Sequence, residues 1–205
     1  MNVAFGMKAH SGWAAMVAIG EYDGGLVVVD RRRIELVEDE WAKQPYHAAE
    51  DLKPGAARDV VKRGVEAARR IAVREMRAAM KRERERENEI TGCAVLVVDP
   101  MPDWSVDEIL AVHLRMHKAE GVLFRDALVR AAKACGLRLV EIPEKMLTLR
   151  AERALGLPES SLTKEIAMLG KAAGPPWGKD QKEAALAALV ALRGDWSEES
   201  AVQKK

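Results

Sequence analysis

A strand, helix and second strand between residues 92 and 144 constrain the fold more than any other part of the sequence. Residues 95–98 form a continuous apolar run, Val-Leu-Val-Val, which is typical of a strand buried on both faces of a sheet. Asp99 and Pro100 end this run, and a second strand is expected at residues 137–143. The helix between them would act as a right-handed crossover, so the two strands are predicted to be parallel.

The start of the crossover helix is well specified. Ser105 is its expected N-cap, because Glu108 completes a capping box three residues later. Trp104 and Ile109 stand at the two positions of a hydrophobic staple. One uninterrupted helix is predicted from there to Gly136, which suits a left-handed C-cap.

The sequence upstream predicts three antiparallel strands followed by a long helix. Turn-forming residues separate the strand-like segments, and apolar residues recur every three or four positions in the helix. A loop with one helical turn at residues 47–51 is expected before the helix, and it carries His47. The predicted strands cover residues 2–9, 12–20 and 25–37, and the helix covers residues 56–87.

The sequence downstream predicts three more helices around one irregular segment. Glycines and prolines at residues 170–181 predict a mobile or ligand-covering loop. The helices are expected at residues 144–155, 160–169 and 181–192. With 205 residues and 48% hydrophobic content, the chain is predicted to form one domain at residues 1–196 and a disordered tail at residues 197–205.

Charge and composition exclude several classes of protein. The 33 basic and 32 acidic side chains leave a net charge of +1, so the chain lacks the global field of a dedicated nucleic-acid or membrane binder. No apolar run approaches the roughly 18 residues that a membrane span requires. Cys93 and Cys135 suit reduced, apolar positions, which favours a cytoplasmic protein without membrane association.

The crossover helix carries candidate metal ligands. His113 and His117 are four residues apart, and Glu120 lies one turn further on the same flank. Glu120 is also close to the apolar stripe of the helix, where a carboxylate must be paired, metal-bound or protonated. Two interpretations remain open: this trio binds a metal, or Glu120 pairs with an arginine or histidine across the core.

A cluster of arginines and the absence of several catalytic signatures also bear on function. The first long helix carries Arg69, Arg70, Arg74 and Arg77, a modest basic stripe that could contact the phosphates of a nucleic acid. Signatures of serine hydrolases, P-loop proteins and dinucleotide-binding proteins are absent, as is any CxxC pair.

The predicted order of elements resembles that of the ribonuclease H-like superfamily, and local passages resemble its Holliday-junction resolvase (RuvC-like) branch. These passages are the Gly-Trp turn in residues 8–14, Asp99 after the fourth strand, residues 120–145, and Asp180 at the start of an alanine-rich helix. The resemblance implies a mixed five-stranded α/β sheet flanked by helices, a nucleic-acid partner and a Mg²⁺ or Mn²⁺ site. Asp99, Glu120 and Asp180 are its expected catalytic residues, and these three with His113 and His117 are its expected metal ligands.

One departure from the resolvase pattern bears directly on activity. The family's nuclease depends on a first-strand aspartate, whereas no acid precedes Glu21 here, and Met7, or alternatively Phe5, is expected to occupy that place. Two-metal cleavage requires several carboxylates around the ions. Three functions stay open: a nucleic-acid-binding relative with weakened or lost cleavage, a metal-dependent hydrolase with an altered carboxylate and histidine site, or a non-catalytic scaffold or homodimeric subunit.

Overall fold

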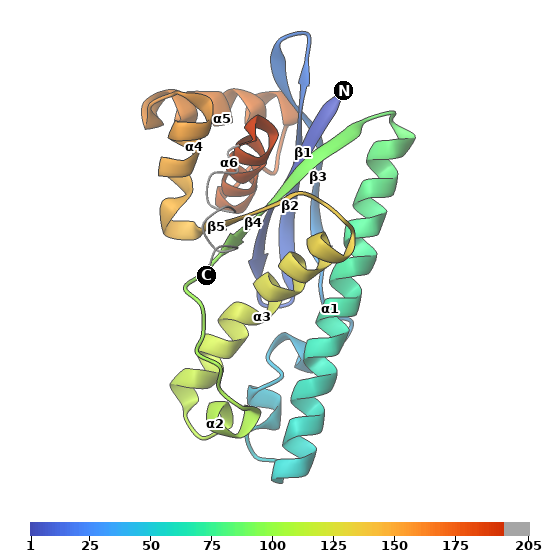
Figure 1. The fold of residues 1–205 in the computed structure, drawn as a ribbon, viewed down its shortest axis with the longest axis vertical. Coiled ribbons are helices and arrows are strands. Elements are labelled where there is room, and N and C mark those ends of the chain that lie inside the picture. The colour runs from blue at the N-terminus through green and yellow to red at the C-terminus, as the bar shows by residue number, and fades with distance from the viewer. Residues whose placement is uncertain (195–205) are drawn as a thin grey trace, which may run out of the picture.

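The computed structural model describes residues 1–194 and contains one five-stranded sheet in the order β3-β2-β1-β4-β5 (Figure 1). The strands are β1 (Asn2–His10), β2 (Trp13–Tyr22), β3 (Gly25–Glu35), β4 (Glu89–Val97) and β5 (Leu139–Pro143). The first three strands form an antiparallel meander, β4 is parallel to β1, and β5 is parallel to β4. The predicted ribonuclease H-like sheet is therefore confirmed. The predicted tail at residues 197–205 lies outside the described residues.

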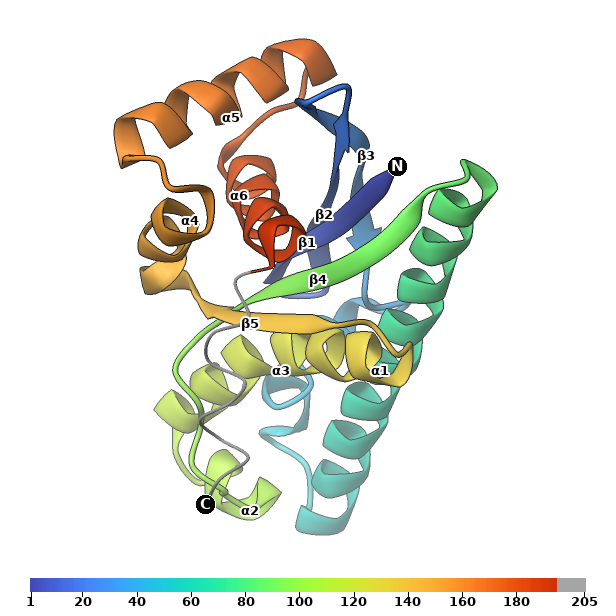
Figure 2. The ribbon, with the colours of Figure 1, turned by 45° about the horizontal axis from the view of Figure 1, so that its top comes forward.

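Helices cover both faces of the sheet (Figure 2). The α-helices are α1 (Pro54–Glu85), α2 (Val106–Leu110), α3 (His113–Ala134), α4 (Leu147–Leu155), α5 (Glu159–Ala173) and α6 (Lys179–Arg193). Short 3₁₀ helices are η1 (Glu40–Lys43), η2 (His47–Ala49) and η3 (Glu144–Met146). No helix in this part of the chain combines the length and hydropathy needed to span a bilayer.

Strand alternation divides the core between these two faces. Phe5 and Met7 point into a cluster with α1 and α3, whereas Ala4 and Gly6 face α6. A Cβ at Gly6 would collide with the backbone of Ala184, so only glycine permits this close approach of α6 to the central strand. The alanine-rich sequence of α6 serves the same contact, since its buried residues are mostly alanine.

The crossover helix departs from its prediction. The capping box of Ser105 and Glu108 is present, but it begins α2, which ends after five residues. Val112 then adopts an extended conformation, with φ −139° and ψ 112°, and α3 begins at His113. Val112 is 41% exposed, so it does not join the buried face of the helix. The break lets α2 pack beside the first part of α1 rather than continue the line of α3.

The predicted irregular segment at residues 170–181 is shorter than expected. α5 continues to Ala173 and α6 begins at Lys179, so only residues 174–178 connect them. Arg31 on β3 donates hydrogen bonds to the carbonyl oxygens of Gly174 and Pro176 at 2.6 Å, and the Trp177 indole donates to the Ile166 carbonyl oxygen at 3.0 Å. The connection is tied to β3 and α5 by these contacts.

A small second cluster lies beyond the end of the sheet. The N-terminal half of α1 extends past the strands and packs there with η2, α2 and the start of α3 (Figure 1). Its buried members are Tyr46, Ala49, Ala57, Val61, Ile109, Met116 and Ala119. This distal cluster brings the segment around His47 to the first two turns of α3.

Candidate functional site

The three predicted catalytic acids have three different sets of partners. Asp99 pairs with Lys145 at 2.8 Å, and its side chain is 73% exposed. The hydrogen bond and charge of Lys145 lower the pKa of Asp99. Glu120 pairs with His47, and Asp180 lies beside Lys8. The structure therefore distributes these acids over separate contacts instead of one carboxylate cluster.

A lysine lies beside the acids of α6. Lys8, near the end of β1, is only 6% exposed, and it points to the α6 face because it follows the alternation of Ala4 and Gly6. Its ammonium forms an ion pair with Glu183 and lies 3.5 Å from Asp180 Oδ1. Asp180 and Glu183 are three residues apart, so both project from one side of α6. We call Lys8, Asp180 and Glu183 the lysine–carboxylate cluster.

The surrounding carboxylates keep Lys8 charged. Burial alone would lower the pKa of Lys8, but the hydrogen bond and charge of Glu183, together with the charges of Glu144 and Asp180, outweigh it and raise the pKa. Glu144 is itself paired with Arg125 at 2.6 Å. The ammonium thus neutralises carboxylates that would otherwise repel one another.

An aromatic stack borders this cluster. The His10 ring stacks on Trp13, with centroids 4.4 Å apart, and His10 Nε2 lies 3.0 Å from Asp180 Oδ1 without the alignment of a hydrogen bond. The Arg33 guanidinium lies 4.0 Å from the centroid of the Trp13 ring. These contacts hold the end of β1 and the start of β2 against α6.

Met7 was expected to point toward the predicted acids, but it does not lie beside Asp180. Its side chain is fully buried among residues of α1 and α3, on the opposite face of the sheet from Asp180. Phe5, the alternative, lies on the same face as Met7. The first-strand residue beside the acids is Lys8, one position later, because a shift of one residue moves a side chain to the other face.

The lysine–carboxylate cluster does not fit the Mg²⁺ or Mn²⁺ site that the family resemblance implies. Those ions require oxygen ligands, and a pair of ions requires several carboxylates. Here β1 supplies an ammonium, and it already pairs with Glu183 and approaches Asp180. A divalent ion at this place would meet like charge from Lys8.

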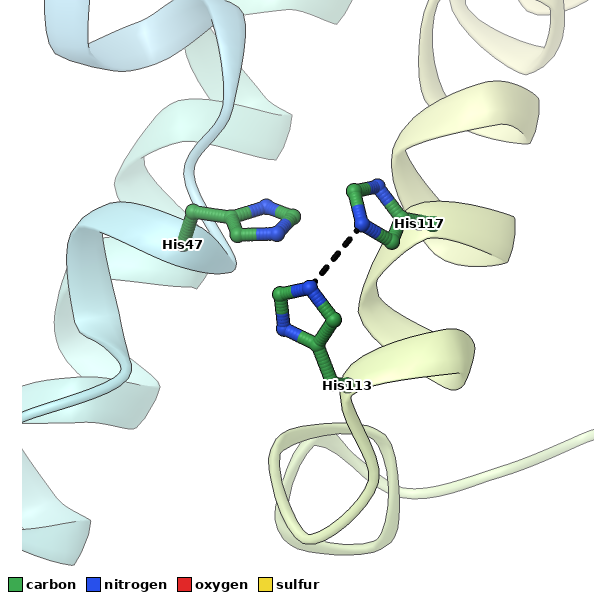
Figure 3. Close-up of side chains that lie close together, drawn as sticks. All are labelled: His47, His113 and His117. Atoms are coloured by element: carbon green, nitrogen blue, oxygen red, sulfur yellow. Dashed lines mark hydrogen bonds between the residues drawn. The ribbon is translucent and has the colours of Figure 1, made fainter.

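A second group of side chains gathers at the distal cluster (Figure 3). His47, His113 and His117, called here the histidine cluster, place ligand nitrogens within 4.8 Å of one another. Among residues 1–194 they are the one group of three histidine, cysteine or acidic side chains that meets this distance. The Nε2 atoms of His113 and His117 are 3.1 Å apart. Of the five predicted metal ligands, the structure brings His113, His117 and Glu120 into one neighbourhood.

Glu120 lies behind the histidine cluster rather than within it. The carboxylate is 5% exposed; His47 Nδ1 donates to its Oε2 at 2.7 Å, and the His47 backbone N–H donates to its Oε1 at 3.1 Å. The prediction that Glu120 needs a partner is confirmed, and the partner is a histidine. Burial, with the added charge of Glu120, raises the pKa of the neighbouring Tyr46.

The predicted basic stripe lies on the outer face of α1 and is partly neutralised. Arg70 and Arg74 pair with Glu38 at 3.4 and 2.8 Å, and Arg69 pairs with Asp126 at 3.0 Å. Arg77 is exposed on the same stretch of helix. The four arginines and Val73 line a shallow hollow of about 550 Å³.

Sequence reasoning missed Lys8, Glu183 and His47 as members of these clusters. The small residues at positions 4 and 6 signalled the face of β1 that meets an alanine-rich helix, and Lys8 shares that face. Glu183 could have been found from its spacing to Asp180. His47 had no such signal, because only the tertiary fold brings η2 to α3.

Comparisons with known proteins support the fold. No protein-family model and no curated protein matches this chain. Among solved structures, Thermus thermophilus RuvC in complex with Holliday junction substrate aligns with a TM-score of 0.50 and 10% identity, over 93% of this chain and 92% of that one. A second Thermus thermophilus RuvC structure aligns with a TM-score of 0.47 and 11% identity, over 92% of each chain. At this identity the likeness extends to the fold, which is RuvC-like.

Proposed function

We propose that this protein is a nucleic-acid-binding relative of the RuvC-like resolvases in which phosphodiester cleavage is weakened or lost. The observation that carries the proposal is the lysine–carboxylate cluster on a resolvase-like sheet. Lys8 contributes a permanent positive charge where the family resemblance implies an acid on the first strand. The charge that a metal ion would supply to Asp180 and Glu183 is supplied by the chain.

The basic stripe on α1 is the proposed phosphate contact. Arg70 and Arg74 are held by Glu38 in exposed ion pairs, which contribute little to stability. A phosphate could therefore displace Glu38 without a large cost. Branched DNA is the first ligand to test, because the RuvC structure of similar fold contains a Holliday junction substrate.

Binding is tested by gel shift with a four-way junction, duplex DNA and single-stranded DNA at several salt concentrations. We expect salt-sensitive binding, and Arg74→Ala should weaken it and reduce the salt slope by about 1. Glu38→Gln should strengthen binding, because it removes the competing carboxylate. Lys164→Ala removes one positive charge at an exposed position of α5. It is the control and should have no effect on binding. Equal effects of Arg74→Ala and Lys164→Ala would reject the α1 surface.

Cleavage is tested on the same substrates with Mg²⁺ or Mn²⁺. We expect no cleavage by the wild-type chain. Lys8→Asp should create a Mg²⁺-dependent rise in melting temperature, because it replaces the ammonium with a third carboxylate. Met7→Asp is the control, since it places an acid in the apolar core on the other face and should only destabilise. Wild-type cleavage that is lost in Asp180→Asn would overturn the proposal.

A further inference from the structure

We infer that the histidine cluster is a binding site for a divalent late transition metal, with Zn²⁺ as the best fit. His47, His113 and His117 would be its protein ligands. The inference does not depend on nucleic-acid binding, and it concerns a site at the distal cluster rather than the carboxylates of α6. Three imidazoles with a fourth position open to solvent form a common zinc coordination.

The ring orientations favour ligation through Nε2. The Nδ1 atom of His47 is engaged by Glu120, which leaves Nε2 as its available ligand atom. The Nε2 atoms of His113 and His117 face each other at 3.1 Å, so at least one of them must present a lone pair to the other. Two nitrogens bound to tetrahedral zinc at about 2.0–2.1 Å lie about 3.3 Å apart. The His113–His117 pair is therefore already spaced as two zinc ligands would be.

Carboxylates stand behind two of the three rings. Glu120 accepts the His47 Nδ1 hydrogen at 2.7 Å, and Glu50 Oε1 lies 3.7 Å from His113 Nδ1. Metal-bound histidines usually donate their second ring N–H to a carboxylate or carbonyl group, which fixes the ring and makes it a stronger ligand. This arrangement also explains a carboxylate that is 5% exposed, because a metal-bound imidazole would give Glu120 a cationic partner.

Access and ligand type set the choice of metal. The His113 side chain is 62% exposed and His117 is also exposed, so an ion can enter from solvent and keep a water molecule as its fourth ligand. Imidazole nitrogens suit Zn²⁺, Cu²⁺ and Ni²⁺, whereas Mg²⁺ requires oxygen ligands. The ligand nitrogens lie within 4.8 Å of one another, and rotation about the side-chain torsions of exposed rings can bring them to zinc-binding distances.

The test uses the full chain without a polyhistidine tag, stripped with chelator and titrated calorimetrically with Zn²⁺ and with Mg²⁺. We expect one equivalent of Zn²⁺ with micromolar or tighter affinity, no heat from Mg²⁺, and visible absorption of four-coordinate Co²⁺ in a parallel titration. His117→Gln should lower zinc affinity at least about 10-fold. Glu120→Gln should lower it about 10- to 100-fold through His47.

His10→Gln is the matched control, because His10 is the fourth histidine and lies at Asp180 instead. It should bind zinc as the wild type does. His113 and His117 are exposed, so their variants should remain folded. Circular dichroism of each variant checks this, and a spectrum that matches the wild type assigns lost zinc binding to the lost ligand. Absence of zinc binding by the wild type, or equal affinity in His117→Gln and His10→Gln, would overturn the inference.

Discussion

The lysine–carboxylate cluster and the histidine cluster differ in where their positive charge comes from. In the first, the chain provides the cation, and the Lys8 side chain is 8% exposed between β1 and α6. In the second, the chain provides ring nitrogens and a buried carboxylate behind them, and the rings of α3 are open to solvent. In this RuvC-like fold, the candidate metal ligands therefore lie away from the carboxylates of α6. The acids of α6 need no ion from solution, whereas the histidines are arranged to take one.

The largest expected effect comes from removing the internal cation. Lys8→Met should destabilise the protein by about 3 kcal/mol, the lower end of the cost of breaking a buried ion pair, because Asp180 and Glu183 are 27% exposed. His113→Gln, in metal-free protein, should change stability by less than about 0.5 kcal/mol, as at most surface positions. Urea denaturation of both variants measures this contrast. Similar losses of stability in the two variants would mean that Lys8 does not act as a buried counter-charge to Asp180 and Glu183.

A slightly smaller effect is expected when zinc is added. At a concentration 100 times the dissociation constant, a ligand specific for the folded state stabilises it by about 2.7 kcal/mol. Zn²⁺ should therefore stabilise the wild type and Lys8→Met by the same amount, because the two clusters share no residue. Mg²⁺ should stabilise neither. Thermal melts with each ion and with chelator provide the measurement, and a zinc response that disappears in Lys8→Met would break the comparison.

The smallest effect concerns pH. The pKa of Lys8 is raised above 10.5 in the folded state, so its contribution to stability is fully present below that pH and is lost as the pH rises through the folded-state pKa. The difference in unfolding free energy between wild type and Lys8→Met should therefore be constant from pH 7 to about 9.5 and shrink above pH 10.5. Paired urea titrations across this range measure it. A difference that grows with pH would contradict the charge assigned to Lys8.

The fold followed from local patterns, whereas both clusters depend on tertiary packing. Periodicity predicted the meander, the long helix and the crossover because each segment repeats its pattern over many residues. The break at Val112 was missed because valine there fits the helical period and no glycine or proline marks it.

The candidate sites depend on tertiary packing even more than the fold does. Met7 and Phe5 were the two residues expected in place of the family's first-strand acid, and both lie on the face of β1 opposite Lys8. Glu120 was correctly expected to need a partner because its helix position is buried. That the partner is His47, 73 residues earlier, could not follow from any local pattern.

The length of α1 has a consequence for how the molecule opens. Its 32 residues span about 48 Å, and its two halves contribute to different apolar clusters: Ala57 and Val61 to the distal one, Ala72 and Met76 to the one against the sheet. We expect amide hydrogens in the first half to exchange through partial unfolding that leaves the strands intact. An ion shared by η2 and α3 would slow that exchange at one end of the helix alone, so that a single continuous helix would belong to two cooperative units.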